Sequence, residues 1–330
     1  NNYMCGIFGY IGTDDRAAQK IIRGLKDLEY RGYDSWGVAV RDAQAQELYS
    51  KKDIGKISSI AEKDFSGILG DTAIGHSRWA THGGVTKKNA HPHFNHDKTI
   101  AVVHNGIIEN ADALRRSLSQ GKRNLFISET DTEVIPHLID HFMQSGKSLE
   151  EAFISTCGEL KGRFAFVVIH TGSDFLLAGR SGSPLIIGKG DGEYFIASDI
   201  PAFLEYTQVV NYLDDGEYVK LSRGKAEFRS FHTQKKISKK DITIAFDKKA
   251  ASKGEWGHFM LKEIVEQKDS LARAINQDDK AIKKIAQEIK KARGVFLSGC
   301  GTAGKVCMAA EYFFSVVSER HTNFAPSSEF

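Results

Sequence analysis

A cysteine stands beside a methionine near the start of the sequence. Cys5 follows Met4 and precedes Gly6 and Ile7. If Met4 and the residues before it are removed, Cys5 carries a free α-amino group, and the pKa of such a group is about 8. That amine can act as general base for the thiol of the same residue, without a histidine partner. Gly6 leaves room for a substrate to approach the backbone. Taken alone, the motif also fits a small thiol buried in a core.

A second group of functional side chains lies between His76 and Gly84, where the sequence reads HSRWATHGG. Arg78 can grip a carboxylate through two parallel hydrogen bonds, and Thr81 offers a hydroxyl group. The two final glycines would let the segment bend or close. The alternative is a surface loop whose tryptophan packs into the core, but the density of functional side chains favours a binding loop.

A third group follows an apolar run directly, in the sequence Val103–Asn110, which reads VHNGIIEN. The side-chain amide of Asn105 and the backbone N–H of Gly106 can point at one spot and form an oxyanion hole. The same pair also fits a plain Asn-Gly turn. Spacing alone does not choose between these two interpretations.

The fourth group is acidic and spans Ser128–Glu133, with the sequence SETDTE. Local rules favour a helix N-cap at Thr130 or Asp131. The functional alternative is an acidic group that binds an ammonium ion. Taken together, the four groups predict glutamine as the substrate. Arg78 would hold its carboxylate, Asp131 its ammonium group and Cys5 would attack its amide carbon, while Asn105 and Gly106 would stabilise the oxyanion.

The elements that must position these residues alternate between strand and helix patterns from Cys5 to about Lys240. Short apolar runs bounded by Gly and Asp predict strands at 7–11, 36–40, 100–104, 163–170, 174–177, 185–187, 194–196, 218–221 and 227–231. Apolar residues at helical spacing predict helices at 18–28, 111–118, 132–143 and 149–160, with Asp14 or Asp15 as the first N-cap. The helices form a block between blocks of strands. We therefore expect an α+β fold in which antiparallel sheets are layered with helices.

A second unit is expected to follow the first. The Lys- and Asp-rich stretch 235–253 reads as a solvated linker, and helices are predicted at 255–276 and 278–292. An apolar strand from Gly294, a glycine turn ending at Thr302 and a helix to about Ser318 indicate the start of a domain with a parallel sheet. One β-α unit cannot bury a core. We therefore expect either a truncated chain or further residues after Phe330.

Composition excludes few classes of function. The 330 residues are 41% hydrophobic and 26% charged with a net charge of +3, which is too small to indicate a nucleic-acid or membrane partner. The four cysteines form no CxxC pair or zinc pattern, and the sequence indicates neither a metal nor a cofactor. No apolar run has the length of a membrane span, and no signal segment opens the chain. A cytoplasmic protein with free thiols is expected.

In combination, these motifs resemble the isomerising glutamine–fructose-6-phosphate aminotransferases, also called glucosamine-6-phosphate synthases. The matching runs cover the first 240 residues: 4–7, 28–35, 76–83, 89–93, 104–110, 128–133, 180–185 and 196–199. The segment 258–267 resembles the interdomain segment of this family, and 298–302 resembles the start of its sugar isomerase (SIS) domain. The resemblance implies domain boundaries at 5–240, 241–292 and 293–330, the last being an incomplete SIS domain of α/β type.

The resemblance implies an N-terminal nucleophile fold, which is a four-layer α-β-β-α sandwich. It also implies that Cys5 forms a thioester, releases ammonia and is then freed by hydrolysis to glutamate. Arg78 and Asp131 would bind the amino-acid end of glutamine, and Trp79 would gate an ammonia channel. Thr81 and His82 would lie in the loop that closes over glutamine. The family implies no cofactor, and a homodimer for the full-length enzyme.

In the isomerase half the resemblance implies fructose 6-phosphate as the sugar, with Gly301 and Thr302 in part of its phosphate pocket. Ala303 replaces the serine that is usual in the family, and Trp36 stands where alanine is common, where we expect it to fill core volume. The second phosphate loop and the catalytic residues of the family would lie beyond Phe330. This chain should therefore not make glucosamine 6-phosphate by itself.

Residues 1–4 are interpreted as an extension that ends in the initiator Met4, with a natural propeptide as the alternative. While Met4 is attached, the α-nitrogen of Cys5 is an amide and cannot accept a proton. We predict that the chain is nearly inactive until residues 1–4 are removed. Two further alternatives stay open: the glutaminase of a purine- or asparagine-pathway amidotransferase, and a sugar-phosphate-sensing module with a silent glutaminase.

Overall fold

The computed structural model describes residues 5–42, 46–80, 83–120, 125–244, 256 and 259–327. The chain divides into two compact units, residues 3–254 and 255–330. None of the described helices is long and apolar enough to cross a membrane.

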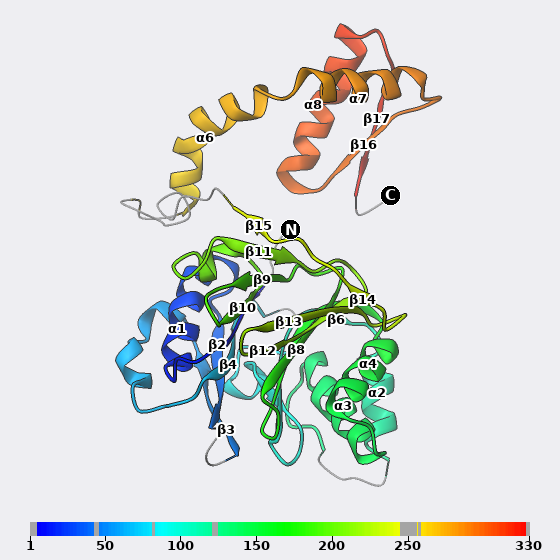
Figure 1. Ribbon diagram of the computed structural model, residues 1–330. Helices are drawn as coiled ribbons and strands as arrows, with labels where there is room; N and C mark the ends of the chain where they lie inside the picture. The colour runs from blue at the N-terminus through cyan, green and yellow to red at the C-terminus, as the bar shows by residue number, and fades with distance from the viewer. Residues whose placement is uncertain are drawn as a thin grey trace. The chain divides into compact units, whose positions relative to one another are not determined.

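The first unit contains two antiparallel sheets (Figure 1). The larger has the order β15-β11-β9-β10-β1-β4-β2-β3 and the smaller β14-β13-β12-β8-β7-β6-β5. The strands of the larger sheet are β1 (Gly6–Ile11), β2 (Ser35–Asp42), β3 (Glu47–Ile54), β4 (Thr72–Arg78), β9 (Ile186–Lys189), β10 (Tyr194–Ala197), β11 (Val209–Tyr212) and β15 (Ile242–Thr243). Those of the smaller are β5 (His93–Phe94), β6 (Ile100–Ile108), β7 (Gly162–His170), β8 (Phe175–Ser181), β12 (Glu217–Ser222), β13 (Lys225–Ser230) and β14 (Lys236–Ile237).

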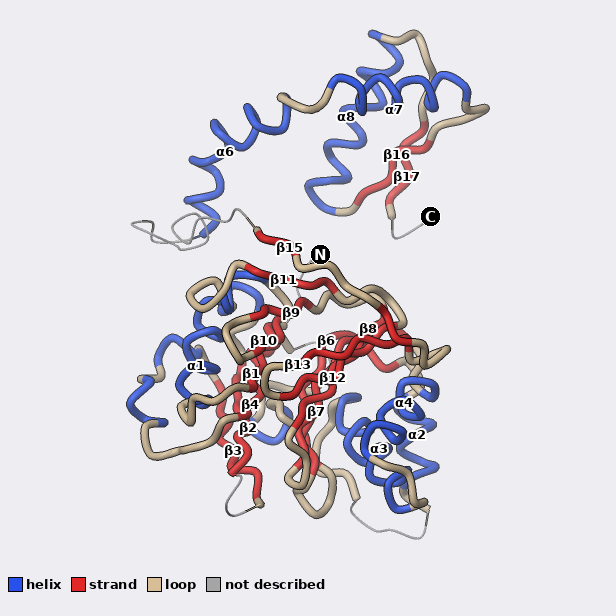
Figure 2. The backbone as a smooth tube through the Cα atoms, viewed as in Figure 1, coloured by secondary structure: helices blue, strands red, loops and turns tan. Residues whose placement is uncertain are grey.

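Helices cover the outer face of each sheet, so that the strands lie in the middle of the unit (Figure 2). Helix α1 (Ala17–Asp27) packs on the larger sheet, while α2 (Ala111–Leu118), α3 (Val134–Gln144) and α4 (Leu149–Glu159) pack on the smaller one. Three separate apolar clusters fill the three interfaces between these layers. The expected four-layer α-β-β-α sandwich is therefore confirmed.

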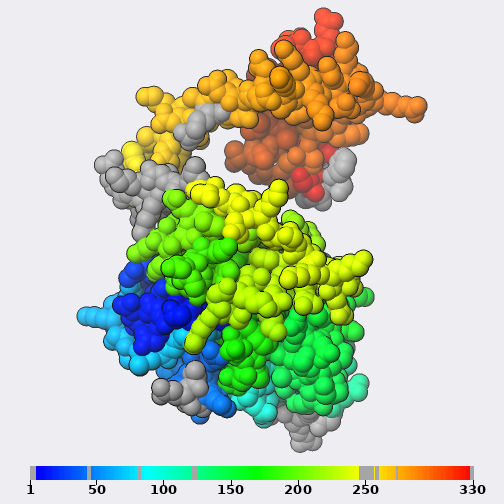
Figure 3. Space-filling view, in the orientation of Figure 1, coloured from blue at the N-terminus to red at the C-terminus, as the bar shows by residue number. Residues whose placement is uncertain are grey.

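Strand β1 shows how the sequence specifies these layers. All six of its residues are buried, because both faces of the central sheet are covered. Ile7 points into the cluster between the sheets, whereas its neighbour Phe8 points toward α1, as the two-residue repeat of a strand requires. In the first unit, green and yellow atoms of later residues cover most of the face seen in Figure 3, which leaves the blue N-terminal residues visible mainly at one side.

The predicted helices and strands of this unit are present, with small shifts at their ends, but six strands were missed. They are β3, β4, β5, β11, β14 and β15. Strand β3 is a largely exposed edge strand with two lysines, and β4 carries His76, Ser77 and Arg78 among its buried residues. The exposure of β3 and the buried polar residues of β4 both hide the apolar pattern on which strand prediction depends. The binding-loop interpretation of residues 76–84 is therefore wrong for its first three residues.

The predicted N-cap of α1 is also wrong. Arg16 occupies the N-cap position and no side chain caps the helix. The Asp14 carboxylate instead accepts hydrogen bonds from the backbone N–H and the guanidinium of Arg16. Trp36 agrees with expectation, since it is buried and packs edge-on against Phe65.

The second unit contains α6 (Phe259–Ile275), α7 (Asp279–Lys291), β16 (Phe296–Gly299), α8 (Gly301–Val317) and β17 (Asn323–Pro326). Strands β16 and β17 pair in parallel and α8 connects them. The parallel pairing predicted for this part of the sequence is present.

Candidate active site

The thiol of Cys5 lies at the entrance to β1, against the backbone of residue 79. Its sulfur accepts a hydrogen bond from the N–H of Trp79 at 3.1 Å and lies 3.5 Å from the carbonyl oxygen of the same residue. Burial raises the pKa of the Cys5 thiol, although the N–H of Trp79 and the Arg78 charge partly oppose the shift. A thiol with a raised pKa stays protonated near neutral pH and needs a base to become a nucleophile.

Two donors hold the carbonyl oxygen of Cys5. Asn105 Nδ2 donates to it at 2.8 Å and Arg31 Nε at 3.3 Å. Arg31 is fixed in turn by an ion pair with Asp199 at 2.9 Å, and the Tyr30 hydroxyl donates to the same carboxylate oxygen. Arg31 has no role predicted from the sequence, although it stands inside the matching run 28–35. Its contact depends on a fold that brings residues 5, 31 and 199 together, so local spacing could not reveal it.

Asn105 and Gly106 lie inside β6 and pair with Ala165 and Phe164 of β7. The Asn-Gly turn considered from the sequence is therefore wrong. Gly106 has a φ of +124°, and an added Cβ would lie 1.9 Å from the carbonyl oxygen of Arg163. Only glycine fits this position. The Asn105 side-chain oxygen lies 3.1 Å from His76 Nε2, which turns the amide nitrogen toward Cys5.

Arg78 is the last residue of β4 and is 3% exposed. Its guanidinium donates to the carbonyl oxygens of Gly84 at 3.1 Å and Gly83 at 3.2 Å. Two parallel donors thus face two oxygens, which is the arrangement that a carboxylate would replace. A carboxylate that approached Arg78 would have to displace these backbone contacts.

Asp131 begins a short 3₁₀ helix at Asp131–Glu133. Thr130 occupies the N-cap position, one of the two residues that local rules favoured, but its side chain makes no capping hydrogen bond. One oxygen of the Asp131 carboxylate accepts the backbone N–H of Ile108 at 2.7 Å. This bond fixes the carboxylate beside the end of β6.

A cavity of about 30 Å³ brings these groups together. Its lining comprises Cys5, Arg78, Trp79, His91, His104, Gly106, Thr130, Asp131 and Thr132. A space of this size holds about one or two water molecules, so an amino acid can enter only if the lining moves. Thr81 and His82, which were also predicted to bind substrate, lie outside the described residues. A hollow of about 820 Å³ beside α2 and α3 is larger but contains none of the predicted residues.

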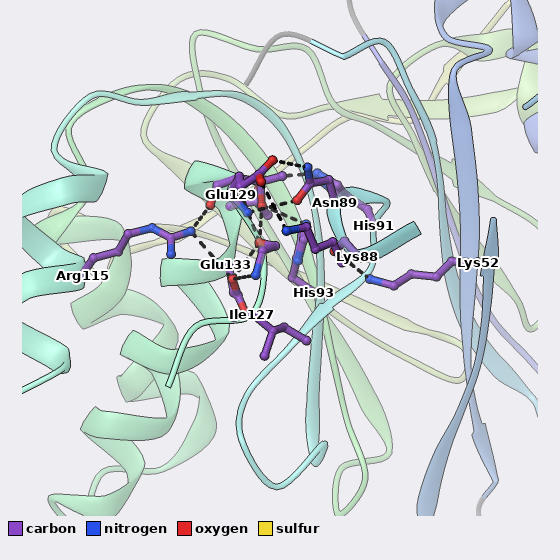
Figure 4. Close-up of polar contacts among 12 residues, drawn as sticks. Lys52, Lys88, Asn89, His91, His93, Arg115, Ile127, Glu129 and Glu133 are labelled. Atoms are coloured by element: carbon purple, nitrogen blue, oxygen red, sulfur yellow. Dashed lines mark hydrogen bonds and ion pairs between the residues drawn. The ribbon is translucent and has the colours of Figure 1, made fainter. Parts of the chain in front are cut away.

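A polar network supports the acidic wall of the cavity (Figure 4). The buried carboxylate of Glu133 accepts the backbone N–H groups of Ile127 and Ser128 at 2.9 and 2.8 Å, and Arg115 lies 3.7 Å away. Asn89 joins a second part of the network, since its amide donates to Gly84 O and to the Glu129 carboxylate. The segments that carry Asp131 and cover Arg78 are therefore tied to each other.

Two buried histidines, His91 and His104, line the cavity, and two more, His76 and His93, pack against His91. His76 stacks on His91 with ring centroids 4.0 Å apart, and His93 packs edge-on against His91. Burial lowers the pKa of His76 to about 3 and lowers the pKa of His91, His93 and His104. These rings are neutral at pH 7. Among the described residues, no group of His, Cys, Asp and Glu is arranged to hold a metal ion.

Of three further predicted residues, Trp79 lines the cavity, whereas Gly301 and Thr302 belong to the second unit. The Trp79 ring packs edge-on against Tyr33 at 4.9 Å, while its backbone contacts Cys5. Gly301 and Thr302 begin α8 in the second unit and are exposed. Gly301 has a φ of +56°, which suits the turn from β16 into the helix.

Comparison with known proteins identifies the central part of the first unit. Residues 76–205 match the model of a glutamine amidotransferase domain. The chain is 40% identical over 321 residues to a protein of Methanococcus maripaludis, and 41% identical over 341 residues to one of Clostridium tetani. Both are named isomerising glutamine–fructose-6-phosphate aminotransferase. The alignments cover 94% and 99% of this chain but 53% and 54% of the relatives, so the chain spans about half their length.

Solved structures support the same assignment of the fold. The glutamine phosphoribosylpyrophosphate amidotransferase of B. subtilis, complexed with ADP and GMP, is similar with a TM-score of 0.59 and 28% identity. The match covers 69% of this chain and 49% of that one. A second structure, described as the allosteric regulatory enzyme of purine biosynthesis, gives the same TM-score at 30% identity.

Proposed function

Because the chain carries a glutamine amidotransferase domain of class II, we propose that its first unit hydrolyses glutamine to glutamate and ammonia with Cys5 as nucleophile. The observation that carries this proposal is the single cavity lined by Cys5, Arg78, Gly106 and Asp131. It offers a thiol, a cation and an anion to one small molecule. Glutamine presents the matching amide, carboxylate and ammonium groups.

The proposed reaction begins when the free α-amine of Cys5 takes the thiol proton. The sulfur then attacks the amide carbon, and the C=O electron pair moves to oxygen. One N–H of the Asn105 amide already donates to Cys5 O, which leaves the second N–H, together with the backbone N–H of Gly106, for the oxyanion. The protonated amine gives its proton to the departing nitrogen, so ammonia leaves and a thioester remains. Water hydrolyses the thioester to glutamate with the same amine as base.

The test uses the processed chain, which begins at Cys5. We expect it to release glutamate from glutamine and to be labelled once by a glutamine-mimicking electrophile, with the added mass on the peptide that contains Cys5. A Cys5→Ala variant should show neither effect. Absence of labelling in the processed chain would favour a silent binding module instead.

We also propose that the ammonia serves fructose 6-phosphate in the complete enzyme, as the names of the relatives suggest. The turn at Gly301 and Thr302 would then contribute to a phosphate pocket, and Trp79 would gate the ammonia path. The domain boundaries 5–240, 241–292 and 293–330, a homodimer and a cytoplasmic location belong to the same proposal. The described cysteines are all free thiols, which supports a reducing compartment.

A purine-pathway glutaminase is the second candidate, because one of the similar solved structures is described as the allosteric regulatory enzyme of purine biosynthesis. Their identity is 28% to 30% and their match stops at 69% of the chain, whereas the aminotransferase relatives align over 94% to 99%. The extended alignment favours the aminotransferase. Adding fructose 6-phosphate or phosphoribosyl pyrophosphate to the complete protein and measuring which sugar is aminated would decide between them.

A further inference from the structure

His104 lines the candidate substrate cavity, although it was not among the residues predicted to act there. It precedes Asn105 on β6, and the alternation of the strand places it on the side that faces α3, as Val102 and Ile108 do. The residue is 3% exposed. Its Nδ1 lies 2.8 Å from the Thr132 hydroxyl, whereas its Nε2 has no hydrogen-bond partner among the described residues. A buried polar atom of this kind requires an explanation.

The hydrogen bonds around His91 determine which nitrogen of His104 carries the proton. The backbone N–H of His104 donates to His91 Nδ1 at 3.3 Å, so that nitrogen is an acceptor without a proton. A neutral His91 must then carry its proton on Nε2, which lies 3.5 Å from the Thr132 hydroxyl oxygen. Because Thr132 receives this donor, its own O–H is free to donate to His104 Nδ1. His104 therefore carries its proton on Nε2, assigned from the network.

Burial keeps both rings neutral, since it lowers the pKa of His91 and of His104. The nearby Asp131 carboxylate acts in the opposite direction on His104 but offsets burial only in part. His104 thus presents one N–H donor, and no positive charge, close to Asp131. Leaving such a donor without an acceptor inside a protein is unfavourable.

We propose that His104 Nε2–H binds the α-carboxylate of glutamine and is a further substrate-binding residue beside Arg78. This inference rests on the proposed function. When the ammonium group of glutamine lies at Asp131 and its amide at Cys5, the α-carboxylate is the substrate acceptor nearest to the residues around Asp131. A neutral N–H can donate to this carboxylate, whereas it cannot accept a bond from the ammonium group.

Two substitutions separate the two ring nitrogens. In His104→Gln the amide nitrogen can take the place of Nε2, while the partner of Thr132 is lost. In His104→Asn a polar atom can take the place of Nδ1, while the Nε2 donor is lost. If His104 has a purely structural role, the Thr132 contact matters most, and the Asn variant should bind glutamate more tightly than the Gln variant. If His104 contacts the substrate as proposed, the Gln variant should bind glutamate more tightly.

The experiment measures the Kd of L-glutamate, the product that retains both the carboxylate and the ammonium group, with the processed chain in a Cys5→Ala background. We expect His104→Asn to raise the Kd about 10- to 100-fold, the range for a lost hydrogen bond to a charged group. The Kd of His104→Gln should rise several-fold less. His141→Asn, on the outer part of α3, is the matched control and should bind like the parent. Parent-like binding by both His104 variants, or weaker binding by the Gln than by the Asn variant, overturns the proposal.

A second measurement needs no substitution in the binding chain and decides the case in which both variants bind weakly. The Nε2 proton of His104, assigned by its loss in His104→Gln, is followed by NMR. Glutamate should shift this resonance downfield, whereas isoglutamine, in which an amide replaces the α-carboxylate, should shift it less. Saturation with glutamate without a shift contradicts the contact. If the parent chain binds no glutamate at all, the proposed function is wrong. If the parent binds glutamate and the two His104 variants bind it equally well, only the proposal for His104 is wrong.

Discussion

The side-chain nitrogen of Asn105 lies 2.8 Å from the carbonyl oxygen of Cys5, so a residue on β6 of the smaller sheet holds the nucleophile at the start of β1, a central strand of the larger sheet. This bond crosses the interface between the two central layers of the sandwich. The same amide lies against His76, which restricts its rotation. The Asn105 side chain is therefore both the proposed oxyanion donor and a group that positions the proposed nucleophile.

Removal of residues 1–4 should activate the chain. The amide nitrogen that joins Met4 to Cys5 cannot accept the thiol proton, and general-base catalysis contributes about 10²- to 10⁴-fold to such reactions. We expect the processed chain to release glutamate at least about 100-fold faster than the uncut chain, measured at saturating glutamine. Intact mass confirms the state of each sample. Equal turnover by the two forms would contradict the role of the amine.

Asn105→Ala should lower kcat far more than it changes KM. Loss of one oxyanion donor reduces kcat by about 10²- to 10³-fold in well-studied enzymes. Asn211→Ala is the matched control, because Asn211 is also buried and donates through its amide to Lys240 O, away from the cavity. Steady-state kinetics and a thermal melt of both variants separate a catalytic loss from a loss of stability. A kcat within threefold of the parent would rule out the assigned role.

Arg78→Lys should raise the KM for glutamine by about 10- to 100-fold, since an ammonium group cannot replace two parallel guanidinium donors. We expect kcat to change much less. Arg163→Lys serves as control, because its guanidinium bonds an exposed backbone carbonyl at Gly182. If the KM of Arg78→Lys equals that of the control, the carboxylate is held elsewhere.

Gly106→Ala should destabilise the fold as well as abolish activity. The added methyl group would overlap the carbonyl oxygen of Arg163, and the φ of +124° is unfavourable for alanine. We expect a loss of at least about 2 kcal/mol in the free energy of unfolding, measured with urea. Gly67→Ala is the control, because a Cβ added at Gly67 would meet no atom within 4 Å. A change within 0.5 kcal/mol at Gly106, roughly the range for surface substitutions, would show that β6 and β7 separate easily.

Stability should fall as the pH drops below about 6.5. The unfolded chain then protonates its histidines, whereas burial lowers the pKa of His76, His91, His93 and His104 in the folded chain. Protons therefore favour the unfolded state, by up to about 1.4 kcal/mol per pH unit for each such histidine. Urea unfolding at pH 7, 6 and 5 measures the slope. A His93→Gln variant should show a shallower slope than the parent, and a constant stability across this range would contradict the burial of these rings.

The sequence predicted the layers well because apolar patterns report which faces of an element are covered. It failed where a buried strand carries polar residues, as in β4, where Arg78 was assigned to a loop. The residues Cys5, Arg78, Gly106 and Asp131, which line one cavity, could be singled out from the sequence because each belongs to a short motif with its own chemistry. Arg31 and His104 were missed since their roles depend on partners far along the chain, at Asp199 and Thr132, and no local pattern reports such contacts.

The position of β1 between β10 and β4 has a consequence for the processed chain. A polypeptide end usually frays, because hydrogen bonds secure it on one side at most. Here the new terminus would lead straight into a strand that pairs with β4 from Gly6, opposite Ser77, and with β10 from Phe8, opposite Ala197. The most mobile part of an ordinary chain would thus become one of the stiffest, and the ordering of the amine would be complete before any substrate arrives.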